Sequence, residues 1–195
     1  MTEKVRTLYK YKSIENIQHC VDIVKNNKLY CSPVSNLNDP KEGNFNHLID
    51  PERDEAIRER TEAIIGEQSQ FRVCALSKLA SNMAMLAHYA GNHSGVIFEV
   101  KLNDSPNIFD VKYVKSTPTI DVLRGKKRDI ARLLLTYKME DWSHEQEVRI
   151  ISENNFFGLP RNVESVTFGS MADENKVKPI IAACKKKNIP YRYLN

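Results

Sequence analysis

The sequence has little cysteine and glycine and no long apolar run. Its 195 residues include four cysteines and seven glycines, and no two cysteines have the C-x-x-C spacing. Such spacing argues against a disulfide framework or a zinc site, and it is typical of proteins from reducing compartments. No stretch of about 18 apolar residues occurs, and the first residues lack the apolar core of a signal peptide. We therefore expect a cytoplasmic protein with no membrane partner.

Several motifs of well-known enzymes are also missing. The chain has no Walker loop, no G-x-G-x-x-G, no G-x-S-x-G and no H-E-x-x-H. ATP hydrolysis, Rossmann-type redox chemistry and serine hydrolysis therefore lack support. The net charge of +4 is compatible with an anionic ligand but too small to demand one. Basic runs at 124–128 and 185–187 suit phosphate contacts, but the helix dipole favours cations at such positions as well.

What the sequence does contain is a succession of strand and helix patterns. The apolar fraction of 41% and the charged fraction of 28% are those of an ordinary globular protein. Strands are expected at 8–12, 29–32, 71–77, 95–102, 108–114, 142–151, 163–169 and 191–194. Helices are expected at 14–26, 51–66, 83–90, within 120–138, and at 173–187. We predict an α+β fold in a single domain over residues 1–195, with a mixed or antiparallel sheet of about eight short strands and peripheral helices.

The segment 142–151 is the most informative part of the chain. It begins with the only tryptophan, and its apolar and polar residues alternate as in a strand. Alternation places Glu145, Glu147 and Arg149 on one face. Carboxylates two residues apart on a strand lie about 7 Å from each other, close enough to share a ligand or to divide two acid–base roles. A solvated strand face with an internal ion pair explains the same pattern without any function.

A second dense group of polar residues surrounds the expected helix end at Gly91. His88, Tyr89 and His93 are suited to act as a proton donor, a stacking ring and a ligand contact, and loops at element ends often carry function. Half-buried packing of these amphipathic side chains is the competing interpretation. Two histidines five residues apart do not match a known metal-ligand spacing, so no metal site is expected.

An ordered series of motifs covers nearly the whole chain. The motifs are Leu8-Tyr9-Lys10-Tyr11, Leu29-Tyr30-Cys31-Ser32-Pro33, Asn38-Asp39-Pro40, Val73-Cys74-Ala75-Leu76-Ser77, His88-Tyr89-Ala90 through Gly95, Trp142 with Glu145-x-Glu147-x-Arg149, and Phe168-Gly169. This series resembles the bacterial and phage family catalogued as domain-of-unknown-function family 2971. The chain departs from the family pattern at Ala75, at Leu86-Ala87 and at His144, which changes the expected pocket lining. The family name implies no activity.

A looser resemblance, to the ADP-ribosyltransferase fold, does imply an activity. That fold also begins with a strand bearing a cation, here Lys10, and has a Tyr- or Ser-bearing second strand, here ending at Ser32. It places an E-x-E motif on a late strand, so the resemblance makes Glu147 the catalytic glutamate and has Glu145 position the acceptor.

The same resemblance implies NAD as the substrate. Cleavage of the nicotinamide–ribose bond passes through an oxocarbenium-like state, which a carboxylate stabilises. Tyr89 is expected to stack on the nicotinamide, His88 to supply a proton, and Lys10 to hold the pyrophosphate. Arg149 is expected to contribute to NAD binding and to keep a neighbouring glutamate ionised.

Three functional hypotheses follow. The first is an ADP-ribosyltransferase-like, NAD-binding domain, serving as a toxin or phage–host conflict protein in bacterial defence, with a protein or a nucleic acid as acceptor. The second is a non-enzymatic module that recognises a host or phage protein or a nucleotide ligand. The third is a nuclease that uses His88, His93, Glu145 and Glu147. No cluster of Asp or Glu residues with a known metal-binding spacing supports it.

Overall fold

The computed structural model describes residues 5–195, except for the side chain of Arg53, and confirms the predicted α+β class. Eight strands form one sheet in the order β14-β13-β6-β1-β5-β11-β7, with β3 also paired to β5. Their bounds are β1 (Val5–Lys12), β3 (Ser32–Pro33), β5 (Arg72–Ser77), β6 (Val96–Asn103), β7 (Ile108–Asp110), β11 (Glu147–Ser152), β13 (Ser165–Phe168) and β14 (Tyr191–Tyr193). The sheet is mixed, because β13 and β14 are parallel while the other pairs are antiparallel.

Further elements surround this sheet. Three two-stranded sheets pair β2 (Lys28–Tyr30) with β12 (Phe156–Gly158), β4 (Asn46–His47) with β9 (Thr119–Ile120), and β8 (Lys112–Val114) with β10 (Tyr137–Met139). The α-helices are α1 (Ile17–Asn26), α2 (Glu55–Gln70), α3 (Met83–Tyr89), α4 (Lys127–Leu134) and α5 (Glu174–Lys187). Short 3₁₀ helices are η1 (Val34–Asn36), η2 (Pro51–Arg53) and η3 (Glu140–Glu145). None of the described helices is long and apolar enough to cross a membrane.

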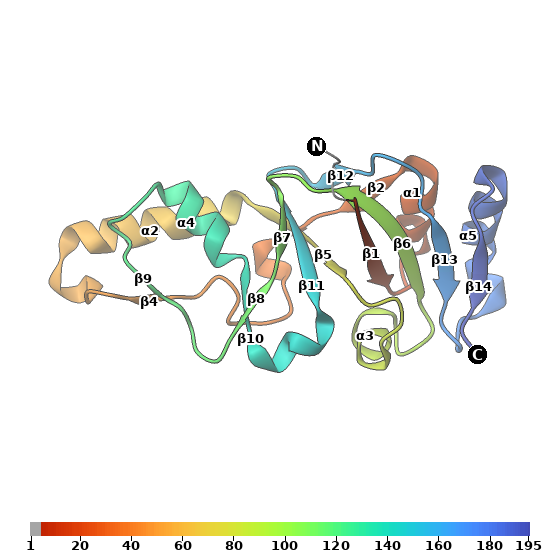
Figure 1. Cartoon of the computed structure of the whole chain (residues 1–195), viewed down its shortest axis with the longest axis horizontal. Coiled ribbons are helices and arrows are strands. Elements are labelled where there is room, and N and C mark those ends of the chain that lie inside the picture. Colours follow the sequence, from red (N-terminus) through yellow and green to blue (C-terminus); the bar gives the residue numbers. More distant parts are fainter. Residues whose placement is uncertain (1–4) are drawn as a thin grey trace.

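The alternation of the strands gives the sheet two different faces. On β11, Val148 and Ile150 belong to the main core, together with buried residues of α1 and α5. Glu147, Arg149 and Ile151 alternate with them and therefore face the other side. The main core lies under α1 and α5, at the right of Figure 1. The opposite face of β5 and β11 lies outside this core and carries the charged side chains of Glu147 and Arg149.

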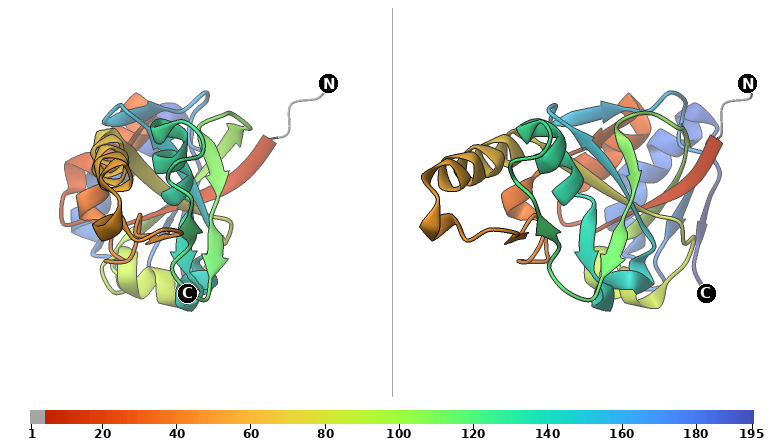
Figure 2. Two further views of the ribbon diagram at one scale, coloured as in Figure 1. Left: turned by 90° about the vertical axis from the view of Figure 1, so that its left-hand side faces the viewer. Right: turned by 60° about the vertical axis from the view of Figure 1, so that its left-hand side comes forward.

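The lobe formed by α2, α4, β4 and β9 stands out from one end of the sheet (Figures 1 and 2). Asp54 begins α2 by accepting hydrogen bonds from the backbone N–H groups of Ala56 and Ile57. Ile57 and Ile64 pack into a second core that also includes α4. The predicted peripheral helix is thus present, but it starts at Glu55 rather than at residue 51 and extends to Gln70, because η2 and a new cap at Asp54 intervene.

Three predicted strands are interrupted. The strand expected at 29–32 is divided at Cys31 into β2, which pairs with β12, and β3, which pairs with β5. Residues 140–145 form η3, so the strand expected at 142–151 begins only at Glu147. Gln146 has a φ of 44°, a left-handed conformation that ends the 3₁₀ turn and breaks the alternation. The strand expected at 108–114 is divided at Val111 into β7, which pairs with β11, and β8, which pairs with β10. Glu145 therefore approaches the sheet from a turn and not from the strand itself.

The sheet opens between β1 and β5. These strands share one register pair, Tyr9 with Ser77, whereas β1 pairs with β6 along its whole length. Lys10 reaches across the opening, and its Nζ donates a hydrogen bond of 2.9 Å to the carbonyl oxygen of Ala75. The divergence of the two strands leaves room for side chains of both to face a common space.

Candidate functional site

A cavity with a volume of about 60 Å³ lies where β1 and β5 diverge. Its walls come from β1, β5, α3 and the segment after η1, and its floor comes from β10, η3, β11 and the same segment. Aromatic and aliphatic side chains form the walls, namely those of Tyr9, Tyr11, Leu37, Leu76, Met85 and Tyr89. Pockets that enclose a drug-sized ligand measure about 300–1,000 Å³, so this cavity has room for one small group only.

The floor of the cavity is a buried cluster of charges. Arg149 Nε donates to Glu147 Oε1 at 2.7 Å, and Arg149 Nη2 donates to Glu147 Oε2 at 3.1 Å. Lys138 Nζ lies 2.6 Å from Glu145 Oε2 and 3.1 Å from Glu147 Oε2. These four side chains are at most 4% exposed. The interpretation of Glu147 and Arg149 as a solvated strand face is therefore wrong.

A third carboxylate, Glu42, belongs to the same cluster. Its Oε2 lies 2.9 Å from Arg149 Nη2 and its Oε1 lies 3.5 Å from Lys138 Nζ, with 2% of the side chain exposed. Three carboxylates facing two cations leave a formal charge of −1 if all are ionised. Burial raises the pKa of Glu42, and the nearby Arg149 and Lys138 offset this only in part. Uptake of one proton by Glu42 would make the cluster neutral.

The other charges of the cluster stabilise one another. Burial by itself would raise the pKa of Glu147, but Arg149 and then Lys138 outweigh it, so that its pKa is lowered. Burial would lower the pKa of Lys138, but Glu147 and Glu145 raise it on balance. Glu147 and Lys138 are thus held in their charged forms, and the floor of the cavity stays ionic although it is buried.

Tyr89 connects this floor to the walls. Its hydroxyl donates to Glu145 Oε1 and accepts a hydrogen bond of 2.7 Å from Asn38 Nδ2. Burial, followed by the hydrogen bond to Glu145, raises the pKa of Tyr89. The tyrosine therefore stays protonated and donating. Because Asn38 is exposed while Glu145 is buried, this chain of hydrogen bonds runs from the surface to the charged floor.

Three backbone contacts fix the turn that presents Glu145. Ser77 Oγ donates to the Glu145 carbonyl at 2.6 Å, and Lys78 N donates to the Gln146 carbonyl at 3.1 Å. The backbone N–H of Glu147 donates to the Tyr113 hydroxyl at 2.8 Å. Gln146 between the two glutamates is left-handed, and both carboxylates reach Lys138.

The structure brings together most of the residues selected from the sequence. Lys10, Tyr89, Glu145, Glu147 and Arg149 all line the cavity.

Three selected residues need correction, because Ser32, His88 and His93 do not line the cavity. His93 lies in the loop after α3, where its backbone carbonyl accepts a hydrogen bond of 3.0 Å from Met171 N. Ser32 lies on β3 and pairs with Val73. His88 is exposed on α3, where one residue of helix corresponds to a rotation of about 100°, so that it points elsewhere than Tyr89.

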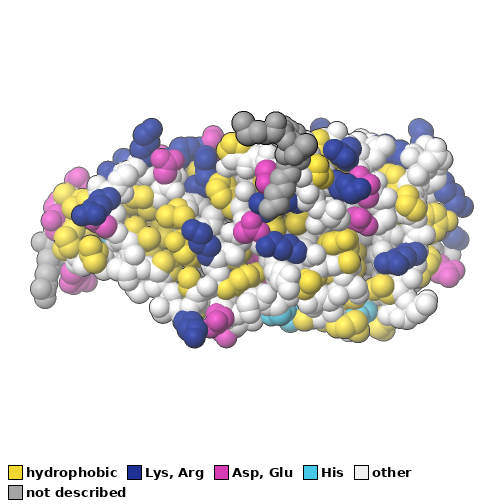
Figure 3. Space-filling model, in the orientation of Figure 1, with side chains coloured by type: hydrophobic (Ala, Val, Ile, Leu, Met, Phe, Trp, Pro, Cys, Tyr) yellow, Lys and Arg dark blue, Asp and Glu magenta, His cyan; other side chains and the backbone are white. Residues whose placement is uncertain are grey.

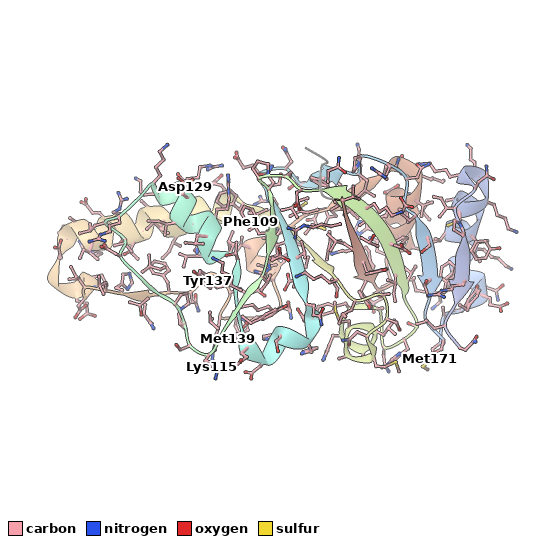
Figure 4. The ribbon with its side chains drawn as sticks, viewed as in Figure 1. Phe109, Lys115, Asp129, Tyr137, Met139 and Met171 are labelled. Carbon is pink, nitrogen blue, oxygen red and sulfur yellow. The ribbon has the colours of Figure 1, made fainter. Side chains whose placement is uncertain are left out.

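Sequence reasoning missed Lys138 and Glu42. Lys138 lies on the three-residue strand β10 between Tyr137 and Met139, which are labelled in Figure 4. Glu42 lies in a turn-rich segment that follows η1. A lone lysine in a polar stretch and a glutamate in a loop normally indicate solvent exposure. The one signal in the sequence is the charge balance of the segment 145–149. Glu145 and Glu147 outnumber Arg149, which indicates that a further cation lies nearby.

Comparison of the chain with protein-family models, with curated proteins and with solved structures gives no match. Within residues 5–195, no group of three or more His, Cys, Asp or Glu side chains is arranged to hold a metal ion.

Proposed function

We propose that the cavity binds the nicotinamide end of NAD and that the chain is an ADP-ribosyltransferase-like domain. The observation that carries the proposal is the convergence of Lys10, Tyr89, Glu145 and Glu147 on one cavity with aromatic walls. Flat rings suit such walls, and the few polar groups at the floor would orient them. The cavity volume of about 60 Å³ limits the buried part of a ligand to a small group.

Glu145 is the better placed of the two carboxylates to meet a ribose hydroxyl. Both oxygens of Glu147 are engaged by Arg149 and Lys138. One oxygen of Glu145 is engaged only by the Tyr89 hydroxyl, which a ligand hydroxyl can replace. A carboxylate in a dry site stabilises developing positive charge on the ribose far better than it does in water. In this proposal Glu147 holds Lys138 and Arg149 in place, and Glu145 contacts the substrate.

The two cations Arg149 and Lys10 likewise have different roles in this proposal, one structural and one in ligand binding. The three guanidinium nitrogens of Arg149 already have partners in Glu147, Glu42 and the Leu135 carbonyl, so this residue has a structural role. Lys10 has one hydrogen bond, to the carbonyl of Ala75. It remains the cation available for a phosphate at the cavity mouth.

The first experiment is thermal unfolding of the purified protein with and without millimolar NAD. A ligand that binds only the folded state stabilises it by about 2.7 kcal/mol at 100 times its Kd. The protein is also incubated with NAD and cell extract. Chromatography then measures the nicotinamide that is released, which reports turnover. Tyr89→Phe and Glu145→Gln are expected to reduce both signals. Tyr30→Phe, which alters an exposed tyrosine beside Phe156, is the matched control. Unchanged unfolding in NAD, together with no release of nicotinamide, would refute the proposal.

A non-enzymatic binding module is the second candidate. Its support is the number of internal ion pairs in the floor, since a cluster whose charges mostly pair with one another stabilises a shape and leaves few groups free to react. Stabilisation by NAD without release of nicotinamide would favour this function. A role as a toxin or in a phage–host conflict is part of the first proposal, and its acceptor is a protein or a nucleic acid.

A further inference from the structure

The single tryptophan of the chain stands in a group of rings beside the cavity. Trp142, on η3, is near-parallel to His144, with 6.3 Å between ring centroids and 27° between planes. His88, on α3, meets Trp142 edge-on at 6.5 Å. We call these three side chains the aromatic shelf. Both histidines are exposed and Trp142 is partly exposed, so the shelf faces solvent. Figure 3 shows histidine side chains at the lower edge of the molecule, in the region of η3 and α3.

The shelf borders the cavity on two sides. Lys138 Nζ lies 4.7 Å from the centroid of the Trp142 ring, and the His88 ring lies 6.2 Å from that of Tyr89. Both Lys138 and Tyr89 line the cavity. Lys138 belongs to the buried floor, whereas Tyr89 is half-buried, so a ligand that leaves the cavity past Tyr89 reaches His88 and then the rest of the shelf.

One side chain fixes the two halves of the shelf to each other. Asn82 caps α3, since its Oδ1 accepts from Met85 N at 3.1 Å, and its Nδ2 donates to the His144 carbonyl at 3.1 Å. The His144 ring in turn lies 3.1 Å, through Nδ1, from the Asp141 carbonyl oxygen. The shelf is therefore assembled in advance from α3 and η3, and a ligand would not have to order it.

The small volume of the cavity limits what the aromatic shelf would bind. A cavity of about 60 Å³ cannot enclose a dinucleotide, so most of such a ligand must lie outside. We propose that the aromatic shelf is a second subsite, which stacks the purine ring of a dinucleotide whose other ring enters the cavity. This inference rests on the proposed function. Tryptophan and histidine rings stack on bases of any sequence, because every base has a π-face.

The test compares NAD with nicotinamide mononucleotide, which lacks the adenosine monophosphate half. Binding of each is measured by calorimetry for the wild type, Trp142→Ala, Trp142→Phe and the control Phe156→Ala, which removes an exposed ring on β12. Trp142→Ala is expected to weaken NAD binding by roughly ten- to a hundredfold, the range of one base-stacking contact. It should leave the mononucleotide unaffected. Trp142→Phe should retain part of the affinity. Trp142 fluorescence in the wild type should change with NAD and much less with the mononucleotide.

The outcomes separate the two proposals. If NAD binds Trp142→Ala as tightly as the wild type, the shelf is not a subsite, although the cavity proposal stands. If both ligands lose affinity equally, Trp142 acts through Lys138 on the cavity, and the second subsite is again refuted. If neither ligand binds the wild type, the proposed function fails and the shelf proposal fails with it. Thermal unfolding of each variant shows that it is folded before binding is compared.

Discussion

Arg149 and Glu147 form a two-point ion pair within one strand, and both side chains are buried, at 1% and 4% exposure. A pair two residues apart on a surface strand would contribute little to stability. In this dry setting each charge instead depends on its partners for all of its solvation.

Replacement of Glu147 by Gln is therefore expected to destabilise the fold by about 3 kcal/mol, the lower end of the cost of breaking a buried pair. The lower end applies because Glu42 remains to compensate Arg149. Urea unfolding measures the change. Glu153→Gln is the matched control, since Glu153 pairs with Arg128 at the surface and is 63% exposed. A Glu147→Gln protein as stable as Glu153→Gln would contradict the burial argument.

The stability of the protein should respond to pH through Glu42. Its pKa is raised above the ordinary 4.5, so the folded state retains a proton that the unfolded chain releases. This contribution to stability is fully present below the unfolded pKa and is lost as pH rises through the folded pKa. Glu42→Gln removes the titration, so the variant should gain stability relative to wild type between pH 4.5 and neutral pH. The free energy of unfolding of both proteins is measured across this range. If the stability of Glu42→Gln relative to wild type stays constant or decreases as pH rises, the predicted direction is wrong.

Gln146 should tolerate glycine better than a branched residue. Its φ of 44° is left-handed, a conformation that costs an L-residue about 1–2 kcal/mol and costs glycine almost nothing. Gln146→Gly is expected to leave stability unchanged or slightly higher, and Gln146→Val to lower it by more than about 1 kcal/mol. Gln146 is exposed, so no packing change confuses the comparison. Equal stabilities of the two variants would show that the turn relaxes.

Ser77 should influence the site although it does not line it. Its Oγ holds the Glu145 carbonyl and accepts from Leu79 N, and the side chain is fully buried. Ser77→Ala leaves both groups without this partner, so we expect a loss of about 1–3 kcal/mol. Any NAD affinity should fall as well, because Glu145 is no longer fixed. Ser35→Ala, at an exposed position on η1, is the control, and equal effects of the two changes would disprove the role of Ser77.

Local patterns predicted those parts of the fold that depend on neighbours in sequence. The helix at 173–187 has a side-chain cap at Asp173 and apolar residues at helical spacing, and α5 begins within one residue of the expected start. Alternation likewise predicts β1, and the strands expected at 95–102 and 163–169 correspond to β6 and β13. Their partners were not, because pairing between distant strands leaves no mark in a single sequence.

The site is predictable only in part, because some of its residues are close together in the sequence and others are not. Glu145 and Glu147 were visible because they are close in sequence to Trp142 and Arg149. Lys138 and Glu42 were missed because nothing local distinguishes a buried lysine or glutamate from an exposed one, and only the tertiary fold removes both from water. The change from strand to 3₁₀ turn at 140–145 was missed because a left-handed glutamine has no sequence signature.

The buried charges also constrain the order in which the molecule can assemble. They come from the segment after η1, from β10, and from η3 with β11, which lie about a hundred residues apart along the chain at the extremes. An intermediate that docks one segment without the others would bury a charge without its counter-charge, which is strongly unfavourable. Partly formed versions of this region should therefore be sparsely populated, and its segments should open and close together as one cooperative unit in hydrogen exchange.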